Sequence, residues 1–373
     1  MPRMNFSTEN LRQVFAEEGK YDHFRQLCSS LVRGEDVYEL DDQGNERKVS
    51  KSDANRAVRK VLMEVCGITE ADMNSKKARK RKEEAHKNEI FEIIEEDVDF
   101  KINEGFEESE WFNQFVDMKN VKLGDANEFE TPDKSVLVVA EIAGDHHDIT
   151  MQQLGEGERF PVKTSSYGIK IGKDIDLIIL GRVDYTKLVD KITEAFVQFV
   201  QNMMYTETYN ASSKLPSGSG LIGSGTLGAS TKAKFDAIIE KVGALNNSEV
   251  VIMGTKNALK KLNDLSDVDW RADSQKEAVA NSGRLGSYEG TELFEIPQRV
   301  KIGDINSYLF DNDVLLIMPV IEDKFVKFVD EGETEIFEVT DKAQLVDDFQ
   351  TYEVKRTMGI AVVLGQYFGR WNL

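Results

Sequence analysis

The longest periodic pattern of apolar residues lies between residues 184 and 210. In the stretch DYTKLVDKITEAFVQFVQNMMYTETYNA, apolar side chains recur every three or four positions, as on one face of an α-helix. Asp184 is suited to cap the start of this helix, and Val189, Val200 and Met204 widen its apolar stripe. Five residues are expected to form its inner face: Leu188, Ile192, Phe196, Phe199 and Met203. The pattern predicts a rod of about 24 residues, or roughly 36 Å.

The first hundred residues are also predicted to be helical, and they are rich in charge. In SKSDANRAVRKVLMEVCG, Ser50 or Ser52 is suited to cap a helix that ends at Gly67. A second helical stretch follows in NSKKARKRKEEAHKNEIFEIIEEDVDF, where the basic half precedes the acidic half. That order opposes the helix dipole. We expect residues 1–105 to form a helical N-terminal region or arm, followed by a linker over residues 106–133.

The cluster KKARKRK, residues 76–82, has three interpretations. It could contact nucleic acid, or it could contact an acidic neighbouring subunit. The interpretation that the sequence favours is a solvated helix face, because most charge runs are of this kind.

The pattern changes at residue 134. KSVLVVAEIAG is typical of a strand, and the stretch that ends in GKDIDLIILG extends the β-type pattern. The segment Gly155–Glu158 is the natural bend between the two. The residues between these runs are mostly polar, so residues 134–182 are predicted to form a long β-hairpin with little core of its own.

Residues 229–345 alternate between helical and strand patterns. TKAKFDAIIEKVG predicts a helix, SEVVIMG a buried strand, and TKNALKKLNDL a helix capped by Thr255. TELFEIP, DVLLIMPV, KFVKFV and TEIFEV are typical of strands, and Asp330–Gly332 is expected to turn one hairpin. The inner face of the first helix is predicted to consist of Phe235, Ile238, Ile239 and Val242.

The chain ends on apolar and aromatic residues, whereas most chains end on polar ones. The stretch YEVKRTMGIAVVLGQYFGRWNL therefore predicts a buried final strand within residues 346–373. Tyr367, Phe368 and Trp371 are expected to pack in a sheet or against a helix.

The charge balance is acidic, with 47 Lys and Arg against 67 Asp and Glu and a formal net charge of −20. Such a charge keeps a concentrated protein soluble and does not favour gripping phosphates. Two cysteines, Cys28 and Cys66, are interpreted as free buried thiols in a reducing compartment. The chain shows no membrane span and no export signal at its N-terminus.

No motif predicts a catalytic residue, a cofactor or a metal site. GSGLIG, Gly218–Gly223, matches G-x-G-x-x-G, but that motif binds nucleotides only between a strand and a helix. Here a long helix precedes it, so a flexible connection is favoured. His146 and His147 are adjacent, and neighbouring side chains on a strand point to opposite faces, which suits one metal ion badly.

The order of these elements from residue 134 to residue 373 resembles the major capsid protein of tailed double-stranded DNA phages, whose fold is shared with encapsulin-type shells. In that α+β fold, a long hairpin called the extended loop runs into a spine helix. The resemblance implies a peripheral domain over residues 183–228, an axial domain over 229–345, and a return strand of the peripheral domain over 346–373. It also implies that the final strand lies along the spine helix, with Gly359 and Gly365 permitting a bend.

The resemblance implies a structural protein rather than an enzyme. Such a protein assembles into hexamers and pentamers of an icosahedral shell around DNA, without sequence-specific binding and without a membrane. Portal and scaffolding or decoration proteins are the expected partners, and the virion capsid, assembled in the host cytoplasm, is the expected location. The hairpin residues expected to contact neighbouring subunits are Met151, Leu154, Gly155, Gly157 and Arg159.

Two alternatives stay open. A cellular nanocompartment would share the fold but enclose an enzyme cargo. A nucleotide-binding enzyme would use Gly218–Gly223.

Overall fold

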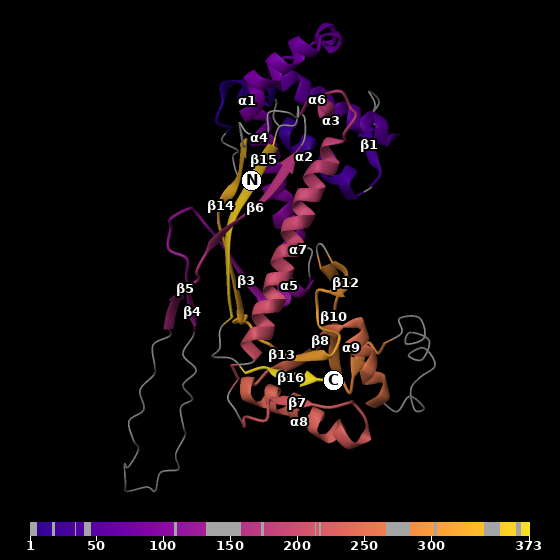
Figure 1. Ribbon diagram of the computed structural model, residues 1–373, viewed down its shortest axis with the longest axis vertical. Coiled ribbons are helices and arrows are strands. Elements are labelled where there is room, and N and C mark those ends of the chain that lie inside the picture. The colour runs from indigo at the N-terminus through magenta and orange to yellow at the C-terminus, as the bar shows by residue number, and fades with distance from the viewer. Residues whose placement is uncertain are drawn as a thin grey trace. The chain divides into compact units, whose positions relative to one another are not determined.

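The computed structural model describes residues 6–16, 19–33, 35–40, 46–107, 110–131, 158–172, 175–212, 214–215, 218–265, 284–301, 304–338, 351–362 and 367–373. The chain is a mixture of helices and sheets and divides into two compact units (Figure 1). Unit 1 comprises Met1–Glu108, Ser165–Val200 and Glu331–Met358. Unit 2 comprises Ser109–Thr164, Gln201–Asp330 and Gly359–Leu373. Each unit is therefore built from three separate stretches of the chain.

Unit 1 holds the N-terminal helices. Its helical elements are α1 (Glu9–Val14), α2 (Lys20–Arg33), α3 (Lys51–Val65), η1 (Glu70–Asn74), α4 (Lys76–Glu107), α6 (Ile175–Ile179) and the first part of α7 (Tyr185–Ser212). A small antiparallel hairpin joins α2 to α3 and consists of β1 (Val37–Leu40) and β2 (Glu46–Val49). The predicted helical character of the N-terminal region is confirmed for these described elements.

The ends of α3 follow from its sequence. The hydroxyl of Ser50 accepts a hydrogen bond from the backbone N–H of Asp53 at 3.2 Å, so Ser50 rather than Ser52 caps the helix. Gly67 adopts a φ of +62° just beyond the last turn, a conformation that glycine reaches without strain. The buried face of the helix consists of Ala54, Val58, Leu62 and Val65.

A four-stranded sheet has the order β3-β14-β15-β6. Its strands are β3 (Val116–Val121), β14 (Val326–Glu338), β15 (Thr351–Val362) and β6 (Ser165–Gly172). β15 and β6 are antiparallel, in a register that runs from Thr351 opposite Gly172 to Met358 opposite Ser165. Helix α7 and strands β14 and β15 each contribute residues to both units.

The predicted hairpin turn at Asp330–Gly332 is wrong. Residues 326–338 form one continuous strand, β14. Gly332 lies inside it with a φ of +83°, so the glycine bends the strand instead of reversing the chain.

The described part of the predicted hairpin over residues 134–182 also differs from the prediction. Pairing begins earlier, where β4 (Glu128–Thr131) lies antiparallel to β5 (Glu158–Pro161). Within the described residues β6 pairs with β15, and residues 175–179 form helix α6 rather than a strand. Burial of Ile178 and Ile179 in a helical turn outweighs the β preference of this apolar run.

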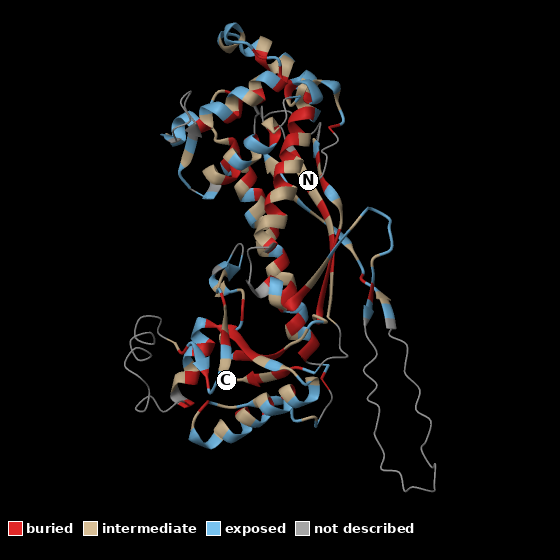
Figure 2. Cartoon of the chain, turned by 180° about the vertical axis from the view of Figure 1, so that it is seen from behind, coloured by how far each residue is buried: buried red, intermediate tan, exposed pale blue. Residues whose placement is uncertain are grey.

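Unit 2 contains a six-stranded sheet of order β7-β16-β13-β8-β10-β9. The strands are β7 (Ile222–Ser224), β16 (Gly369–Asn372), β13 (Val314–Val320), β8 (Glu249–Thr255), β10 (Thr291–Ile296) and β9 (Ser287–Tyr288). β8 and β10 are parallel, and β13 is antiparallel to both β8 and β16. Figure 2 shows buried residues along the strands of this sheet.

Helices cover this sheet as the sequence predicts. α8 (Ala229–Asn246) buries Phe235, Ile238 and Val242, while Ile239 is only half-buried. α9 (Lys256–Lys260) is capped by the Thr255 hydroxyl, which accepts a hydrogen bond from the Ala258 N–H at 3.4 Å, and continues as η2 (Lys261–Leu265). Elsewhere in unit 2 lie α5 (Glu110–Phe115), β11 (Val300–Lys301) and β12 (Asp304–Tyr308).

The C-terminus is buried, but not where the resemblance places it. The predicted return strand is two strands, because β15 lies in the four-stranded sheet and β16 lies in the six-stranded sheet. Phe368 and Trp371 are each 1% exposed, and the Trp371 ring meets Phe235 edge to face at 5.5 Å. β16 fills the space between β7 and β13, so the final residues belong to the core of unit 2. Gly365, one of the two predicted bend glycines, lies outside the described residues.

Gly359 has a packing role rather than a conformational one. A Cβ at this position of β15 would lie 2.5 Å from the backbone oxygen of Lys163. The glycine therefore allows two backbone segments of unit 2 to approach closely.

The long helix α7 is confirmed at 28 residues, but one side of its predicted inner face is wrong. Ile192 and Phe196 are buried, Leu188 and Met203 are half-buried, and Phe199 is 38% exposed. From Ile192 onward the buried positions are four residues apart, and because a helical turn has 3.6 residues the buried stripe rotates around the helix. Phe199 is three residues after Phe196, so its side chain lies outside the buried stripe. The buried stripe consists of Tyr185, Val189, Ile192, Phe196, Val200 and Met204.

This placement predicts opposite outcomes for two similar substitutions. Phe196→Asp buries an unpaired carboxylate and is expected to destabilise the protein by about 3–5 kcal/mol. Phe199→Asp is expected to leave the folded subunit intact, because its ring already reaches solvent. Chemical denaturation of both variants, with circular dichroism as the signal, checks this. Equal losses in the two variants would show that the buried stripe has been assigned to the wrong positions.

Candidate assembly surfaces

A small apolar cluster in unit 2 anchors the base of the β4–β5 hairpin. Phe129 of β4 stacks on Phe160 of β5, with 6.2 Å between ring centroids. Phe129, Val162 and Val329 are buried together. The Asn127 side chain donates a hydrogen bond to the Val162 carbonyl at 2.5 Å. The base of the hairpin is therefore fixed within its own unit.

A buried lysine adds a polar anchor beside this cluster. Lys327 of β14 is 2% exposed, and its ammonium group donates to Asp117 at 2.9 Å and to Asp323 at 2.7 Å. The ammonium groups of Lys327 and Lys119 lie 5.5 and 5.2 Å from the centroid of the Phe129 ring. These contacts join the base of the hairpin to β3 and β14.

The structure places one of the five predicted hairpin contact residues. Arg159 lies in β5, and its guanidinium is 3.4 Å from a carboxylate oxygen of Glu130, with both side chains more than 60% exposed. Such an exposed pair adds little to the stability of the subunit. Met151, Leu154, Gly155 and Gly157 lie outside the described residues.

An aromatic pair, half-buried Tyr167 of β6 and exposed Phe199 of α7, lies on unit 1. The rings of Tyr167 and Phe199 are 4.7 Å apart. β6 stands at one end of the sheet order, so within the described chain one of its edges has no neighbouring strand. An exposed aromatic side chain beside a strand edge without a neighbour is typical of a surface that pairs with another chain.

A buried ionic cluster joins the N-terminal helix α4 to the C-terminal strands of unit 1. The carboxylate of Asp99 accepts hydrogen bonds from the backbone N–H of Thr334 at 3.0 Å and from its hydroxyl at 2.5 Å. The guanidinium of Arg356, 3% exposed on β15, also donates to Asp99 and to the Thr334 hydroxyl. Near the other end of β14, Lys87 bonds Glu338.

Helix α6 is held to α4 by a second buried pair. Arg79 is the one residue of the predicted basic cluster 76–82 that is buried, at 6% exposure. Its guanidinium donates to Asp176 at 2.7 Å, and the pKa of Asp176 is lowered by this bond although burial opposes the shift. Lys82 donates to the Gly67 carbonyl at the end of α3.

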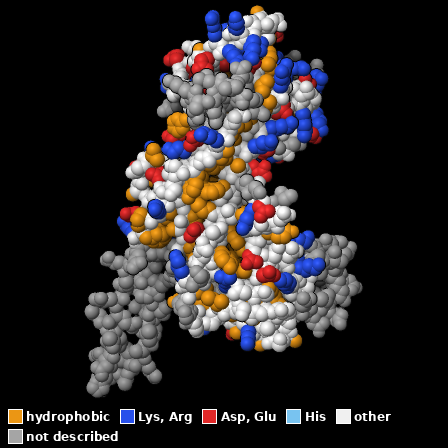
Figure 3. Space-filling model, in the orientation of Figure 1, with side chains coloured by type: hydrophobic (Ala, Val, Ile, Leu, Met, Phe, Trp, Pro, Cys, Tyr) orange, Lys and Arg blue, Asp and Glu red, His pale blue; other side chains and the backbone are white. Residues whose placement is uncertain are grey.

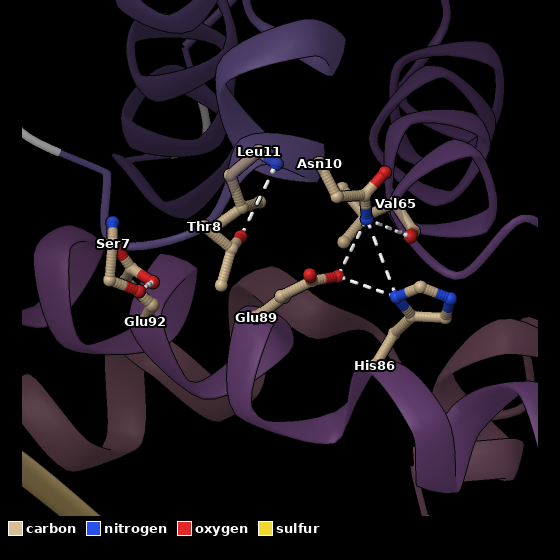
Figure 4. A network of polar contacts seen from close by, with 8 residues as sticks. All are labelled: Ser7, Thr8, Asn10, Leu11, Val65, His86, Glu89 and Glu92. Atoms are coloured by element: carbon tan, nitrogen blue, oxygen red, sulfur yellow. Dashed lines mark hydrogen bonds and ion pairs between the residues drawn. The ribbon is translucent and has the colours of Figure 1, made fainter.

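Helix α1 is docked on α3 and α4 by side-chain hydrogen bonds (Figure 4). The Asn10 amide donates to the Val65 carbonyl at 2.8 Å and to Glu89 at 2.6 Å. Glu89 also lies 2.7 Å from Nδ1 of His86, where α4 has a non-helical φ of −115°. The network therefore sits where α4 kinks, and the N-terminal segment covers that kink.

The glycine motif has a structural explanation. Gly218 and Gly220 have φ of +76° and +66° in the connection that follows α7, and α8 begins only at Ala229. A Cβ at Gly223 would lie 2.3 Å from the Trp371 ring. The last glycine thus makes room for the C-terminal tryptophan, and the arrangement required for binding a pyrophosphate is not present.

The described residues do not meet the requirements of a metal site, a disulfide bond or a membrane-spanning helix. Among the described residues, no group of three or more His, Cys, Asp or Glu side chains is placed to hold a metal ion. His146 and His147 lie outside those residues. Cys28 and Cys66 are free and buried, as predicted. No helix in the described part of the chain is both long and apolar enough to cross a membrane.

A row of acidic residues on α4 has unusual protonation behaviour. Burial raises the pKa of Glu95 and of Glu96 to about 7, and the nearby Asp99 adds to both shifts. Burial also raises the pKa of Asp97 to about 6, against the opposing hydrogen bond from the Tyr185 hydroxyl at 2.6 Å. At a pH between the unfolded and folded pKa values, these three carboxyl groups therefore hold protons in the folded subunit that they release in the unfolded chain.

This row predicts how stability depends on pH. Between about pH 4.5 and 7 the folded state binds more protons than the unfolded state, so stability should increase as the pH falls through this window. The melting temperature of unassembled subunits is expected to be higher at pH 5 than at pH 8. The variant Glu95→Gln/Glu96→Gln should flatten this dependence, and Glu207→Gln, an exposed position on α7, should not. A double variant with the full pH dependence of the parent would contradict the assignment.

Comparison with known proteins gives one family. No curated protein sequence matches the chain. Among solved structures, a chain from Microbacterium phage Oxtober96 is similar with a TM-score of 0.46 and 12% identity, over 71% of this chain and 90% of that one. A chain of the satellite phage P4 procapsid gives 0.45 and 12%, over 73% and 89%. The SrpI encapsulin of Synechococcus elongatus gives 0.39 and 11%, over 70% and 86%.

The family profile described as "SPbeta prophage-derived putative capsid protein YonB" matches residues 23–372. The match covers nearly all of the chain, including α3, α4 and most of α2, which the sequence resemblance left out, whereas α1 lies before the matched residues. The resemblance to phage capsid proteins is thereby confirmed. The chain belongs to the YonB family of capsid proteins.

Proposed function

We propose that this capsid protein assembles into hexamers and pentamers of a closed icosahedral shell that encloses double-stranded DNA. The shell is that of a virion and is assembled in the host cytoplasm. The observation that carries the proposal is the hairpin base. Its strands β4 and β5 are fixed in unit 2 and flank residues 132–157, whose contacts are proposed to lie on other subunits.

The hairpin residues are proposed to make their contacts on neighbouring subunits. Met151 and Leu154 supply apolar contacts, and Gly155 and Gly157 allow the backbone to turn. Arg159 is exposed at the root of the hairpin, where its loose pair with Glu130 leaves it able to bond a neighbouring carboxylate.

The surface proposed to receive a neighbour lies on β6 and α7. It offers a strand edge without a neighbour in the described chain, which can form backbone hydrogen bonds, and the exposed ring of Phe199 beside the half-buried ring of Tyr167. One such contact is weak, but each is repeated at every interface of a shell, so many small gains add up to a stable particle.

Other partners follow from the same role. Portal and scaffolding or decoration proteins are proposed to complete the particle, and DNA is enclosed without reading of its sequence. The protein is proposed to act structurally, without a catalytic group or cofactor. A nanocompartment of the encapsulin type remains the alternative, and the contents of purified particles separate the two. Protected DNA supports the capsid, and a protein cargo supports the nanocompartment.

A hairpin exchange tests the role of residues 132–157. Thr131 and Glu158 are directly paired, so an Asn-Gly turn in place of residues 132–157 closes the hairpin in its native register. The shortened subunit is expected to melt within a few degrees of the parent, because the anchors of the base are retained. It is expected to form no closed shells by electron microscopy.

A second shortened variant serves as the control. Residues 266–283 are replaced by a four-residue Gly-Ser linker, which can close because the Leu285 N–H bonds the Asn263 side chain at 3.2 Å. This variant is expected to assemble. Normal shells from the Asn-Gly variant would refute the role in assembly, and a large loss of melting temperature would place residues 132–157 in the subunit core instead.

A further inference from the structure

One segment of unit 1 has a charge opposite to that of the rest of the chain. Residues 47–82, here called the basic block, contain twelve Lys and Arg against four Asp and Glu, a net of +8. The whole chain has a net charge of −20, so the remainder carries −28. Figure 3 shows Lys and Arg side chains gathered over the N-terminal helices in the upper part of the view.

The basic block presents two matched sets of cations. Arg56, Arg59 and Lys60 share one face of α3, since they are spaced three and four residues apart. The other set has the same spacing on α4 and consists of Lys77, Lys80 and Arg81. Both helices contact α6, so the two sets flank one short helix.

Most of these charges are not used inside the subunit. Within the described part of the chain, Lys60, Lys77, Lys80 and Arg81 make no ion pair. Lys80 is half-buried, and the other three side chains are exposed. Arg56 makes an exposed pair with Asp53 at 3.2 Å. The ionic clusters that stabilise unit 1 therefore do not account for either set.

The second set lies near the N-terminus of α4, where positive charge is unfavourable unless an anion is bound nearby. The first turn of α4 has no acidic residue, although the positive end of a helix dipole favours one there. Lys77, Lys80 and Arg81 instead add positive charge to that end. An external anion would be attracted by the cations and by the dipole together.

Arg56 and Arg59 of the first set line a cavity of about 210 Å³ between α3 and the α6–α7 connection, and Asp184 also belongs to its lining. Ser52 and Asn55 offer polar side chains there, beside Arg56 and Arg59. Nε of Arg59 is buried and has no hydrogen-bond partner in the described residues. Gly181 leaves room for this guanidinium, because a Cβ there would overlap with it. Hydroxyl, amide and guanidinium donors are the groups that bind phosphate oxygens.

The basic block lacks the features of a protein-binding surface. Protein interfaces centre on apolar and aromatic anchors and are depleted in lysine. None of the exposed large hydrophobic residues of the described chain lies within residues 47–82. A surface of cations without an apolar centre suits a phosphate backbone better than a folded protein.

We propose that the basic block binds the phosphate backbone of double-stranded DNA without reading its bases. The inference rests on the proposed function, a shell around DNA, and it assigns the DNA contact to one surface. The −28 carried by the rest of the chain repels DNA elsewhere, which confines contact to the two sets of cations.

Fluorescence anisotropy with a labelled 20-base-pair duplex of random sequence tests the proposal on the full-length subunit. Six phosphate contacts predict a slope of about −5 in a plot of log association constant against log salt concentration. The variant Lys77→Gln/Lys80→Gln/Arg81→Gln should bind more weakly at 50 mM salt, with a slope smaller in magnitude by about 3. Its melting temperature should not fall, because the substitutions relieve the conflict with the helix dipole.

The matched control is Lys234→Gln/Lys256→Gln/Lys260→Gln, which removes three exposed cations from α8 and α9 of unit 2. It should bind the duplex like the parent. No binding by the parent, or equal losses in both variants, would overturn the proposal. Tighter binding of a labelled poly-glutamate peptide than of the duplex would overturn it in favour of an acidic protein partner. Electron microscopy of the α4 variant distinguishes DNA binding from shell assembly. Intact shells of this variant would show that assembly does not depend on the basic block.

Discussion

Arg356 is 3% exposed on β15, and its guanidinium is bound to Asp99 on α4 and to Thr334 on β14. A buried charge is tolerated only when it is paired and hydrogen-bonded, and removal of one partner leaves the other uncompensated at a cost of several kcal/mol. Arg356 and Asp99 are 257 positions apart along the chain. The contact therefore makes the N-terminal helices and the C-terminal strands of unit 1 parts of one folded body.

This constraint explains the character of the N-terminal region. α4 is paired with β14 through Asp99 and Glu338, with α6 through Asp176, and with α7 through Tyr185. Without residues 1–105, Arg356 would lose its carboxylate partner Asp99. Lys327 would keep both of its aspartates, which lie in unit 2. The N-terminal helices are integral to unit 1, and α3 and α4 lie within the residues that the family profile matches.

Much of the fold could be predicted because its signals are local. The period of α7, the Thr255 cap and the apolar runs of β8 and β13 each specify one element without reference to the rest of the chain. The errors lie where distant contacts decide. Asp176 lies in helix α6, which its bond to Arg79 holds to α4. Phe199 is exposed because the buried stripe rotates around α7, and Trp371 lies in the strand that pairs with both β13 and β7. Of the predicted assembly residues, only Arg159 lies among the residues that the structure describes.

The central claim is that residues 132–157 find their contacts on neighbouring subunits. Amide hydrogen exchange measured separately on free subunits and on purified shells tests it most directly. The account predicts that peptides from this segment exchange more slowly in shells than in free subunits, while exchange of the β4–β5 base is the same in both. Equal exchange of the segment in the two states would contradict the account.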